Sequence, residues 1–422
     1  MSHILILGAD GYLGWPTAMY FSNRGYAVTA VDNYFRRNAC TELDVGMLYP
    51  VPTLQERAKL WQELTGREIK VVIGDLSDPE IMRSLFNGRV EYSFALDHSF
   101  TGLPDTVVHY AEQPSAPYSL INYKYANITV QNNLLITNNL MWALRDYSRD
   151  THVIHIGTMG EYGTPNIDIP EGWLEIEHQG RRDTFLFPRQ ASSLYHTTKI
   201  MDTDLMWFAV RMWDLKVTDL MQGPVYGIET EESEISRQYA VSSKQGAEDR
   251  NQRSAVRGQE AEREHLRTIF NYDEIFGTIV NRFITQAVVG YPLTVYGQGG
   301  QTRGYLNIKD TLQCVHMSEQ TPAQKGELRI FNQIMETFSA NELAEMTQRV
   351  GKKLGYDVKI DHLDNPRKEA EEHYYNPTYQ GLIDIGVVPH YLTDEVMEGM
   401  FRVVERYKDN IRTDVIFKGI RW

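Results

Sequence analysis

The chain is poor in cysteine and has no long apolar run. Its 422 residues include only Cys40 and Cys314 as cysteines, too few for a disulfide framework and without metal-ligand spacing, so we expect a reducing compartment and no metal site. No apolar run approaches the length that crosses a bilayer, so no membrane partner is expected. The first strand-like run, HILILG, starts at His3, which leaves no room for a signal or transit peptide and favours a cytoplasmic location.

Positive charge is also scarce. The formal net charge is -14, which argues against a nucleic-acid partner. An anionic ligand would need locally placed arginines and lysines, so single basic positions become informative.

Short β-rich runs alternate with amphipathic segments in the first half of the chain. The runs are HILILG, AVTAVD, KVVIGD, TVVHYAE and HVIHIG. This alternation predicts an α/β fold with a doubly wound parallel sheet of Rossmann type. Later runs and helices near 340–355 and 393–408 predict a smaller α/β substrate-binding lobe. The expected domains are 1–223 with 304–333 for the cofactor, and 224–303 with 334–422 for the substrate.

Two stretches leave alternatives open. Asp204 to Trp213, DLMWFAVRMW, is apolar nearly all round, which suits a helix buried inside the fold or at a subunit interface. The segment 233–265 is polar with few aromatic residues, and predicts an exposed insertion that serves as a passive loop, a lid or a partner site. Thr53 with Glu56, and Ser339 with Glu342, fit helix capping boxes.

A glycine-rich turn follows the first predicted strand. In ILILGADGYLGW, Gly8, Gly11 and Gly14 sit where backbone N–H groups and a helix N-terminus can meet a pyrophosphate. Asp32 ends the second strand, where its carboxylate can accept from ribose hydroxyls and would repel a 2′-phosphate, so NAD is favoured over NADP. The predicted cofactor contacts are Gly8, Asp10, Gly11, Tyr12, Leu13, Gly14, Asp32, Asn33, Arg36, Asp75, Leu76, Tyr195, Lys199 and Gln222.

Tyr195 and Lys199 lie four residues apart in SSLYHTTK and therefore share one helical face. With the glycine motif, this pair resembles the extended short-chain dehydrogenase/reductase family. The ammonium can lower the pKa of the phenol, so Tyr195 can act as a base toward a sugar hydroxyl while hydride leaves to NAD. Thr158, at the end of the fifth predicted strand, would hydrogen-bond the same hydroxyl; its alternative role is a turn cap.

Longer strings narrow the resemblance. LGADGYLGW, EQPSAPYS, GTMGEYGTPNIDI, QASSLYH, LTVYGQGGQTRGYL and NPRKEAEEHYYN are together similar to the UDP-sulfoquinovose synthase family. This resemblance implies UDP-glucose as substrate, sulfite from solution or from a delivering protein as the second partner, and tightly bound, recycled NAD. The implied cycle oxidises C4, removes water across C5 and C6, adds sulfite at C6 and reduces C4 again.

Nucleotide-sugar dehydratases have the sequence Thr-Asp-Glu at this place, whereas this chain has Thr158-Met159-Gly160. The threonine is kept and the two acids are replaced. We expect Met159 and Gly160 to face the substrate, with Met159 forming a non-ionised wall beside sulfite. The acid/base candidates are Glu161 and His196; a solvated loop residue and a structural histidine are their alternatives. Arg189 could place positive charge near sulfite.

The sugar-nucleotide contacts are expected from the second half of the chain. In the resemblance, Arg303 holds the diphosphate, a task that suits a bidentate guanidinium. The remaining substrate candidates are Gln190, Gln222, Tyr226 and Arg367.

The chain departs from the family pattern at one position, and two alternative functions remain open. Ile136 stands where family members usually have glycine, so helix packing near the cofactor should differ. A UDP-sugar 4-epimerase or 4,6-dehydratase is the nearest rival, and a non-catalytic NAD-binding protein is the second. A homodimer through helices at 120–146 and 195–213 is the first expectation for the oligomer.

Overall fold

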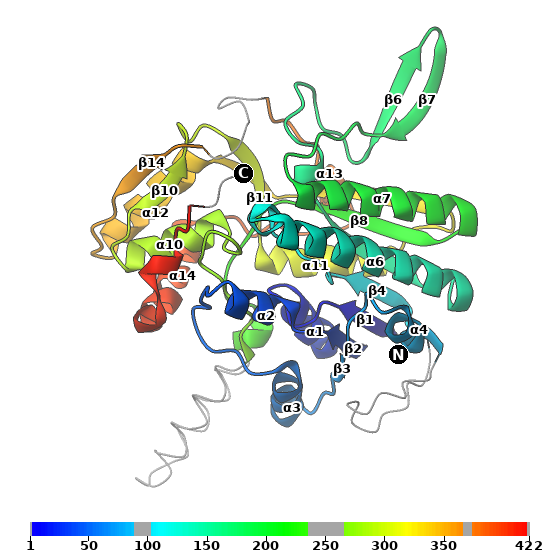
Figure 1. The fold of residues 1–422 in the computed structure, drawn as a ribbon, viewed down its shortest axis with the longest axis horizontal. Helices are drawn as coiled ribbons and strands as arrows, with labels where there is room; N and C mark the ends of the chain where they lie inside the picture. The colour runs from blue at the N-terminus through cyan, green and yellow to red at the C-terminus, as the bar shows by residue number, and fades with distance from the viewer. Residues whose placement is uncertain (1, 88–102, 235–265, 366–373, 420–422) are drawn as a thin grey trace.

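A seven-stranded parallel sheet forms the centre of the larger half of the molecule (Figure 1). The computed structural model describes residues 2–87, 103–234, 266–365 and 374–419. The spatial order of the sheet is β3-β2-β1-β4-β5-β8-β12. Its strands are β1 (His3–Leu7), β2 (Ala27–Asp32), β3 (Lys70–Ile73), β4 (Thr106–His109), β5 (His152–Thr158), β8 (Lys216–Gln222) and β12 (Glu327–Gln333). The chain reverses direction across the sheet between β1 and β4, which is where such folds form their ligand crevice.

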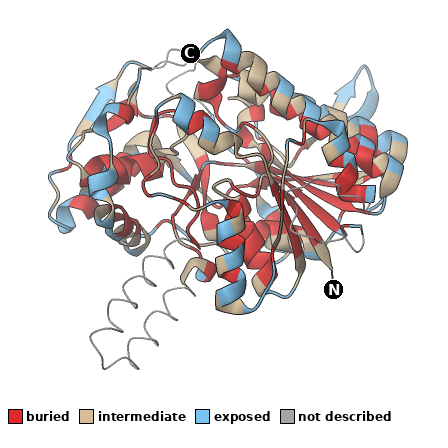
Figure 2. Cartoon of the chain, turned by 60° about the horizontal axis from the view of Figure 1, so that its bottom comes forward, coloured by how far each residue is buried: buried red, intermediate tan, exposed pale blue. Residues whose placement is uncertain are grey.

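Both faces of this sheet are buried. In β1, Ile4 and Ile6 pack into one core and Leu5 and Leu7 into another, because successive side chains of a strand point to opposite faces. The first face is covered by α1 (Gly14–Asn23), α3 (Leu54–Thr65) and α11 (Ile308–Gln320). The second is covered by α4 (Pro79–Asn87), α6 (Tyr123–Tyr147) and α7 (Leu194–Trp213). The predicted Rossmann-type sheet is confirmed, and Figure 2 shows its strands as buried.

A third core lies in the smaller half of the molecule. Helices α10 (Ile279–Val288), α12 (Ala340–Lys353) and α14 (Asp394–Arg406) pack there with α2 (Phe35–Glu42) and the parallel pair β10 (Leu293–Tyr296) and β14 (Ile360–Leu363). A separate three-stranded sheet contains β9 (Val225–Tyr226), β11 (Thr302–Asn307) and β13 (Glu336–Ser339). The expected domain boundaries stay a prediction.

The remaining elements are short. Helices α5 (Ala116–Leu120) and α13 (Gln380–Asp384) connect longer elements, and the hairpin of β6 (Trp173–His178) and β7 (Arg181–Leu186) projects from the body (Figure 1). The sequence analysis did not predict this hairpin. Its turn residues, Gln179 and Gly180, have φ of 51° and 76°, the left-handed backbone that tight hairpins require.

Several local expectations can be checked directly. Both expected capping boxes are present, at the starts of α3 and α12. Within this chain the apolar part of α7 is buried on one side only: Met206 is fully buried, whereas the exposed fraction of Met212 is 62%. Residues 235–265 of the expected insertion lie outside the described residues. In the described part of the chain, no helix combines the length and apolar character that a membrane span needs.

Candidate active site

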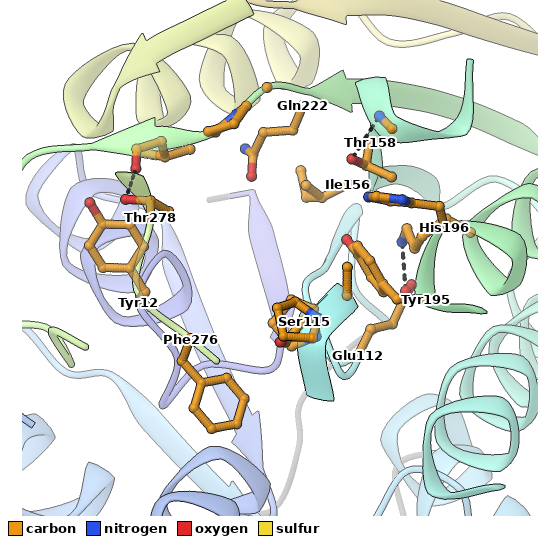
Figure 3. Close-up of a pocket in the computed structure, with 18 of the residues that line it drawn as sticks. Tyr12, Glu112, Ser115, Ile156, Thr158, Tyr195, His196, Gln222, Phe276 and Thr278 are labelled. Atoms are coloured by element: carbon orange, nitrogen blue, oxygen red, sulfur yellow. Dashed lines mark hydrogen bonds and ion pairs between the residues drawn. The ribbon is translucent and has the colours of Figure 1, made fainter. Parts of the chain in front are cut away.

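A cavity of about 740 Å³ lies beyond the carboxyl ends of the large sheet and reaches the smaller half of the molecule (Figure 3). Its walls come from the turn after β1, the ends of β2, β4 and β5, the start of α7, and the segments around α10, β10 and β11. The volume falls in the range of sites for cofactors and small substrates. Both predicted ligand sites therefore open into one space.

The glycines of the turn after β1 are required by close packing. A Cβ on Gly14 would lie 2.1 Å from the carbonyl oxygen of Gly8, and one on Gly8 would lie 2.7 Å from the backbone of Tyr110 and Ala111. Gly8 also has a φ of +83°. Because side chains are excluded, a pyrophosphate can approach the backbone N–H groups at the start of α1. The cradle fits NAD.

Asp32 stands at the end of β2 on the cavity wall. Its carboxylate accepts from the backbone N–H groups of Asp10 at 2.8 Å and Tyr34 at 2.6 Å. Burial, reinforced by the nearby charge of Asp10, raises the pKa of Asp32 to about 6. The carboxylate is thus fixed in place and still ionised at neutral pH, as ribose recognition needs.

The structure brings most predicted cofactor contacts together, but two lie elsewhere. The Asp10 carboxylate accepts from the guanidinium groups of Arg37 at 2.7 Å and Arg57 at 2.5 Å. The Asp75 carboxylate accepts from the N–H and hydroxyl of Ser77. Neither side chain lines the cavity. The predicted residues on its wall are Gly8, Gly11, Tyr12, Leu13, Gly14, Asp32, Asn33, Arg36, Leu76, Tyr195, Lys199 and Gln222.

The hydride-transfer candidates converge on the cavity. Tyr195 enters it from the start of α7 and Thr158 from the end of β5 (Figure 3). Lys199, one helical turn beyond Tyr195, also lines the cavity. Ser193 caps α7, accepting from the N–H of His196 at 3.1 Å. Burial raises the pKa of the Tyr195 phenol, while the Lys199 ammonium works against that rise. The tyrosine and lysine therefore interact as the sequence predicted, and burial outweighs the ammonium.

His196 occupies the space beside the Thr158 turn. A Cβ built on Gly160 would lie 2.3 Å from Nε2 of His196, so glycine is the residue that lets the imidazole in. Nδ1 lies 3.0 Å from the hydroxyl of Ser193, which orients the ring. Met159, Gly160 and His196 all line the cavity.

Glu161 turns away from these residues. Its carboxylate accepts from the N–H of Thr158 at 3.2 Å, and Thr158 accepts from Gly160, so the predicted cap is present. A carboxylate oxygen also lies 3.6 Å from the guanidinium of Arg189. Neither Glu161 nor Arg189 lines the cavity. Burial, with a smaller contribution from Asp219, raises the pKa of Glu161 to about 7 against the attraction of Arg189.

The sequence analysis did not predict the buried cluster of charged residues that contacts Lys199. The ammonium donates to Glu112 at 2.6 Å and lies 2.8 Å from Nε2 of His155. Nδ1 of His155 lies 2.8 Å from Asp219. Glu112 follows β4 by three residues, so its place at the carboxyl end of a parallel strand was the available signal. Glu112, His155 and Asp202 also have the spacing of metal ligands, but the Lys199 ammonium already supplies a cation to Glu112.

Some of the expected sugar-nucleotide residues line the cavity and others do not. Gln190, Gln222 and Arg303 line the cavity. Tyr226 does not: its hydroxyl donates to Glu336 at 2.5 Å from a buried position. Arg367 lies outside the described residues. The cavity wall adds polar residues not predicted from sequence, namely Asn281, Arg282, Tyr296, Gln301 and Tyr375. Ile136, the departure noted in the sequence, lies on the same wall.

Comparison with known proteins agrees with this geometry. Residues 4–267 match the model of the NAD-dependent epimerase/dehydratase family. The chloroplastic UDP-sulfoquinovose synthase of Spinacia oleracea is 42% identical over 99% of this chain and 79% of the relative. The UDP-sulfoquinovose synthase of Sulfolobus acidocaldarius is 37% identical over 99% of this chain and 97% of the relative. The chain belongs to the NAD-dependent epimerase/dehydratase family, in its UDP-sulfoquinovose synthase branch. The predicted family resemblance is confirmed.

Solved structures confirm the fold. The UDP-glucuronic acid 4-epimerase of Bacillus cereus, solved with UDP-glucuronic acid and NAD, is similar with a TM-score of 0.63 at 17% identity, covering 96% of this chain and 99% of that one. The UDP-glucose 4-epimerase of Thermotoga maritima gives 0.64 at 16% identity over the same shares. Family membership confirms NAD as the cofactor.

Proposed function

We propose that this chain makes UDP-sulfoquinovose from UDP-glucose and sulfite. Two nearly full-length relatives carry that name. The observation that carries the proposal is the placement of His196: its imidazole fills the space that any side chain at position 160 would occupy. A dehydratase-type glutamate at that position would have to displace this imidazole, so the arrangement present favours an imidazole beside a methionine as the acid/base group of the site.

The hydride-transfer step uses groups that the cavity brings together. NAD, when bound, accepts the hydride from C4 and later returns it. Tyr195 takes the proton of the C4 hydroxyl, and Thr158 hydrogen-bonds the same oxygen and orients it. Lys199 stabilises the negative charge that develops on the phenol oxygen. The returning hydride and the same proton restore C4, so the cycle consumes no reductant.

His196 is our candidate for the steps at C5 and C6. In its neutral form the imidazole can accept the C5 proton, and the resulting imidazolium can donate it to the departing C6 hydroxyl, so that water leaves and an enone remains. Bisulfite then adds at C6 through its sulfur, and the proton that it brings passes by way of His196 to C5. Met159 gives the incoming anion an uncharged wall, since a carboxylate at this position would repel it. We assign Glu161 to hold the Thr158 turn, because its carboxylate binds the Thr158 N–H.

The diphosphate is assigned to Arg303, and the sugar to Gln190 and Gln222. All three line the cavity. A guanidinium can bind a phosphate with two parallel hydrogen bonds, which fixes the sugar relative to Tyr195.

Incubation of the purified protein with UDP-glucose, with and without sulfite, tests this function. Product mass and the spectrum of bound nicotinamide should be read together. We expect a sulfonated UDP-hexose only when sulfite is present. An isobaric hexose or a dehydrated sugar in both samples would contradict the proposal and identify a 4-epimerase or a dehydratase.

We also propose a homodimer through α6 and α7. Their shared outer face exposes Leu135, Trp142, Met201, Phe208 and Met212, each by 46–62%. Two copies would bury these apolar side chains in a four-helix contact. Light scattering of the wild type and of a Phe208→Glu variant distinguishes this arrangement from a monomer.

A further inference from the structure

The Lys199 ammonium is held at the cavity wall by a carboxylate that is almost fully buried. Nζ donates to Oε2 of Glu112 at 2.6 Å, and the exposed fractions of the two side chains are 2% and 5%. At that distance and burial the two charges interact strongly. The negative charge of Glu112 also acts on Tyr195, where it raises the pKa of the phenol. Glu112 therefore works against the effect for which Lys199 is needed.

His155 is placed to counter Glu112. Its Nε2 lies 3.1 Å from Oε1 of Glu112, the oxygen not used by Lys199, and its Nδ1 lies 2.8 Å from the Asp219 carboxylate. As an imidazolium, His155 donates to both carboxylates, and Lys199 and His155 together balance Glu112 and Asp219. As a neutral imidazole with its proton on Nδ1, it instead accepts from Lys199 across 2.8 Å and leaves one buried carboxylate unbalanced.

The other groups around His155 do not replace its charge. Burial lowers the pKa of His109 to about 3, so that ring stays neutral. Burial also raises the pKa of Asp202 well above its ordinary value, which favours the uncharged form of this carboxyl. Glu161 is a further acid near His155: its carboxylate lies 3.6 Å from Arg189, and the Thr203 hydroxyl lies between it and Asp219. Although burial and Lys199 oppose the imidazolium, Asp219 and Glu112 raise the pKa of His155 to about 9.

We propose that His155 is a positioning residue for hydride transfer: its imidazolium neutralises Glu112, so that the Lys199 ammonium acts on Tyr195. The inference rests on the proposed function only through the oxidation of C4. Without the charge on His155, Glu112 opposes Lys199 and the pKa of Tyr195 rises. A smaller share of Tyr195 is then the phenolate that accepts the C4 proton, and kcat is lower than at the same pH with a charged His155.

The test is the pH dependence of kcat for the NAD-loaded protein with UDP-glucose and sulfite. The kcat of the wild type should rise with pH as the Tyr195 phenolate forms, and this rise should flatten above about pH 9, where His155 loses its proton. In His155→Asn the amide can still donate to Asp219 but carries no charge, so kcat at neutral pH should fall about tenfold for each unit of pKa added to Tyr195. The KM for UDP-glucose should stay unchanged, and the flattening above about pH 9 should disappear. Adding Glu112→Gln to His155→Asn should restore most of kcat.

His152→Asn is the matched control. His152 is buried in the same strand and lies 2.9 Å from the hydroxyl of Thr218, away from Lys199. The inference is overturned if His155→Asn behaves as His152→Asn does, or if the double variant is no faster than His155→Asn. Should His155→Asn not fold, Glu112→Gln alone decides: the kcat of this variant should rise with pH without the flattening above about pH 9, and an unchanged profile overturns the inference.

Product identity separates this inference from the proposed function. A wild type that makes an epimer without sulfonation contradicts the proposed function, while the same variants still report on C4 oxidation and decide the role of His155. A wild type that leaves UDP-glucose unchanged overturns both.

Discussion

Glu112 and Glu161 start from matching positions and end in opposite environments. Each lies three residues beyond the last residue of a parallel strand, β4 for Glu112 and β5 for Glu161, and the two strands are neighbours in the sheet. Glu112 lines the cavity and binds Lys199. Glu161 lies fully buried behind the cavity wall and contacts Arg189.

The local backbone explains the difference. Thr158 and Glu161 form a capping box, in which residues 159–161 wind into a 3-10 turn and the carboxylate folds back to the Thr158 N–H. Glu112 lies in no such turn: its N–H donates to the carbonyl of Tyr110, and the chain runs on to the cap of α5 at Ser115. A residue's distance from a strand end therefore does not locate its side chain until the turn that follows is known.

The largest effect is expected on the Glu112 side, from Lys199→Met. Loss of the ammonium should lower kcat by roughly a thousandfold, in the range of general acid–base contributions. It should also destabilise the fold by about 3–5 kcal/mol, because the buried carboxylates of Glu112 and Asp219 are then left with the His155 imidazolium as their one shared cation. Single-turnover NAD reduction and urea unfolding measure the two effects.

The double variant Lys199→Met with Glu112→Gln separates the effect on kcat from the effect on the free energy of unfolding. The double variant should regain stability, since the unpaired charge is gone, and should stay inactive. Recovery of activity in this variant would show that Lys199 serves only as a counter-charge to Glu112.

A smaller effect is expected on the Glu161 side, from Glu161→Gln. The pKa of Glu161 in the folded protein is about 7, above its ordinary value of 4.5, mainly because of burial. The stability that its protonated form contributes is fully present below pH 4.5 and is lost as pH rises through 7. The glutamine variant lacks this loss, so it should be more stable than the wild type by up to about 3 kcal/mol at pH 8.

Urea unfolding of both proteins from pH 5 to pH 8, compared as a difference, isolates this contribution from other titrating groups. The kcat of Glu161→Gln should remain close to that of the wild type. A hundredfold fall in kcat would instead return Glu161 to the acid/base role that its sequence position suggested.

The cofactor half of the candidate site could be predicted from the sequence because short motifs define it. The glycine turn, Asp32 and the Tyr195 and Lys199 pair each combine contiguous residues with a predicted strand or helix, and all of them line the cavity. The charged cluster was not readable in this way. Its members come from β4, β5, α7 and β8, and only the sheet order places them together. Arg189 shows the converse, since its basic character suggested an anion site and the fold pairs it with Glu161.

The smallest effect is expected in the Thr158 turn itself, from Met159→Asp. Met159 and Gly160 face the cavity while Glu161 turns inward, so this substitution places a carboxylate on the cavity side of the same turn. A like charge near the sulfite path should raise the KM for sulfite about tenfold, the effect of a repulsion as large as one that shifts a pKa by about one unit. The KM for UDP-glucose should stay unchanged. Met159→Leu, of similar volume and no charge, is the matched control and should behave as the wild type does. Equal sulfite kinetics in the aspartate and leucine variants would place the sulfite path away from this turn, and would leave His196, which packs against the turn from α7, as the candidate for the chemistry at C6.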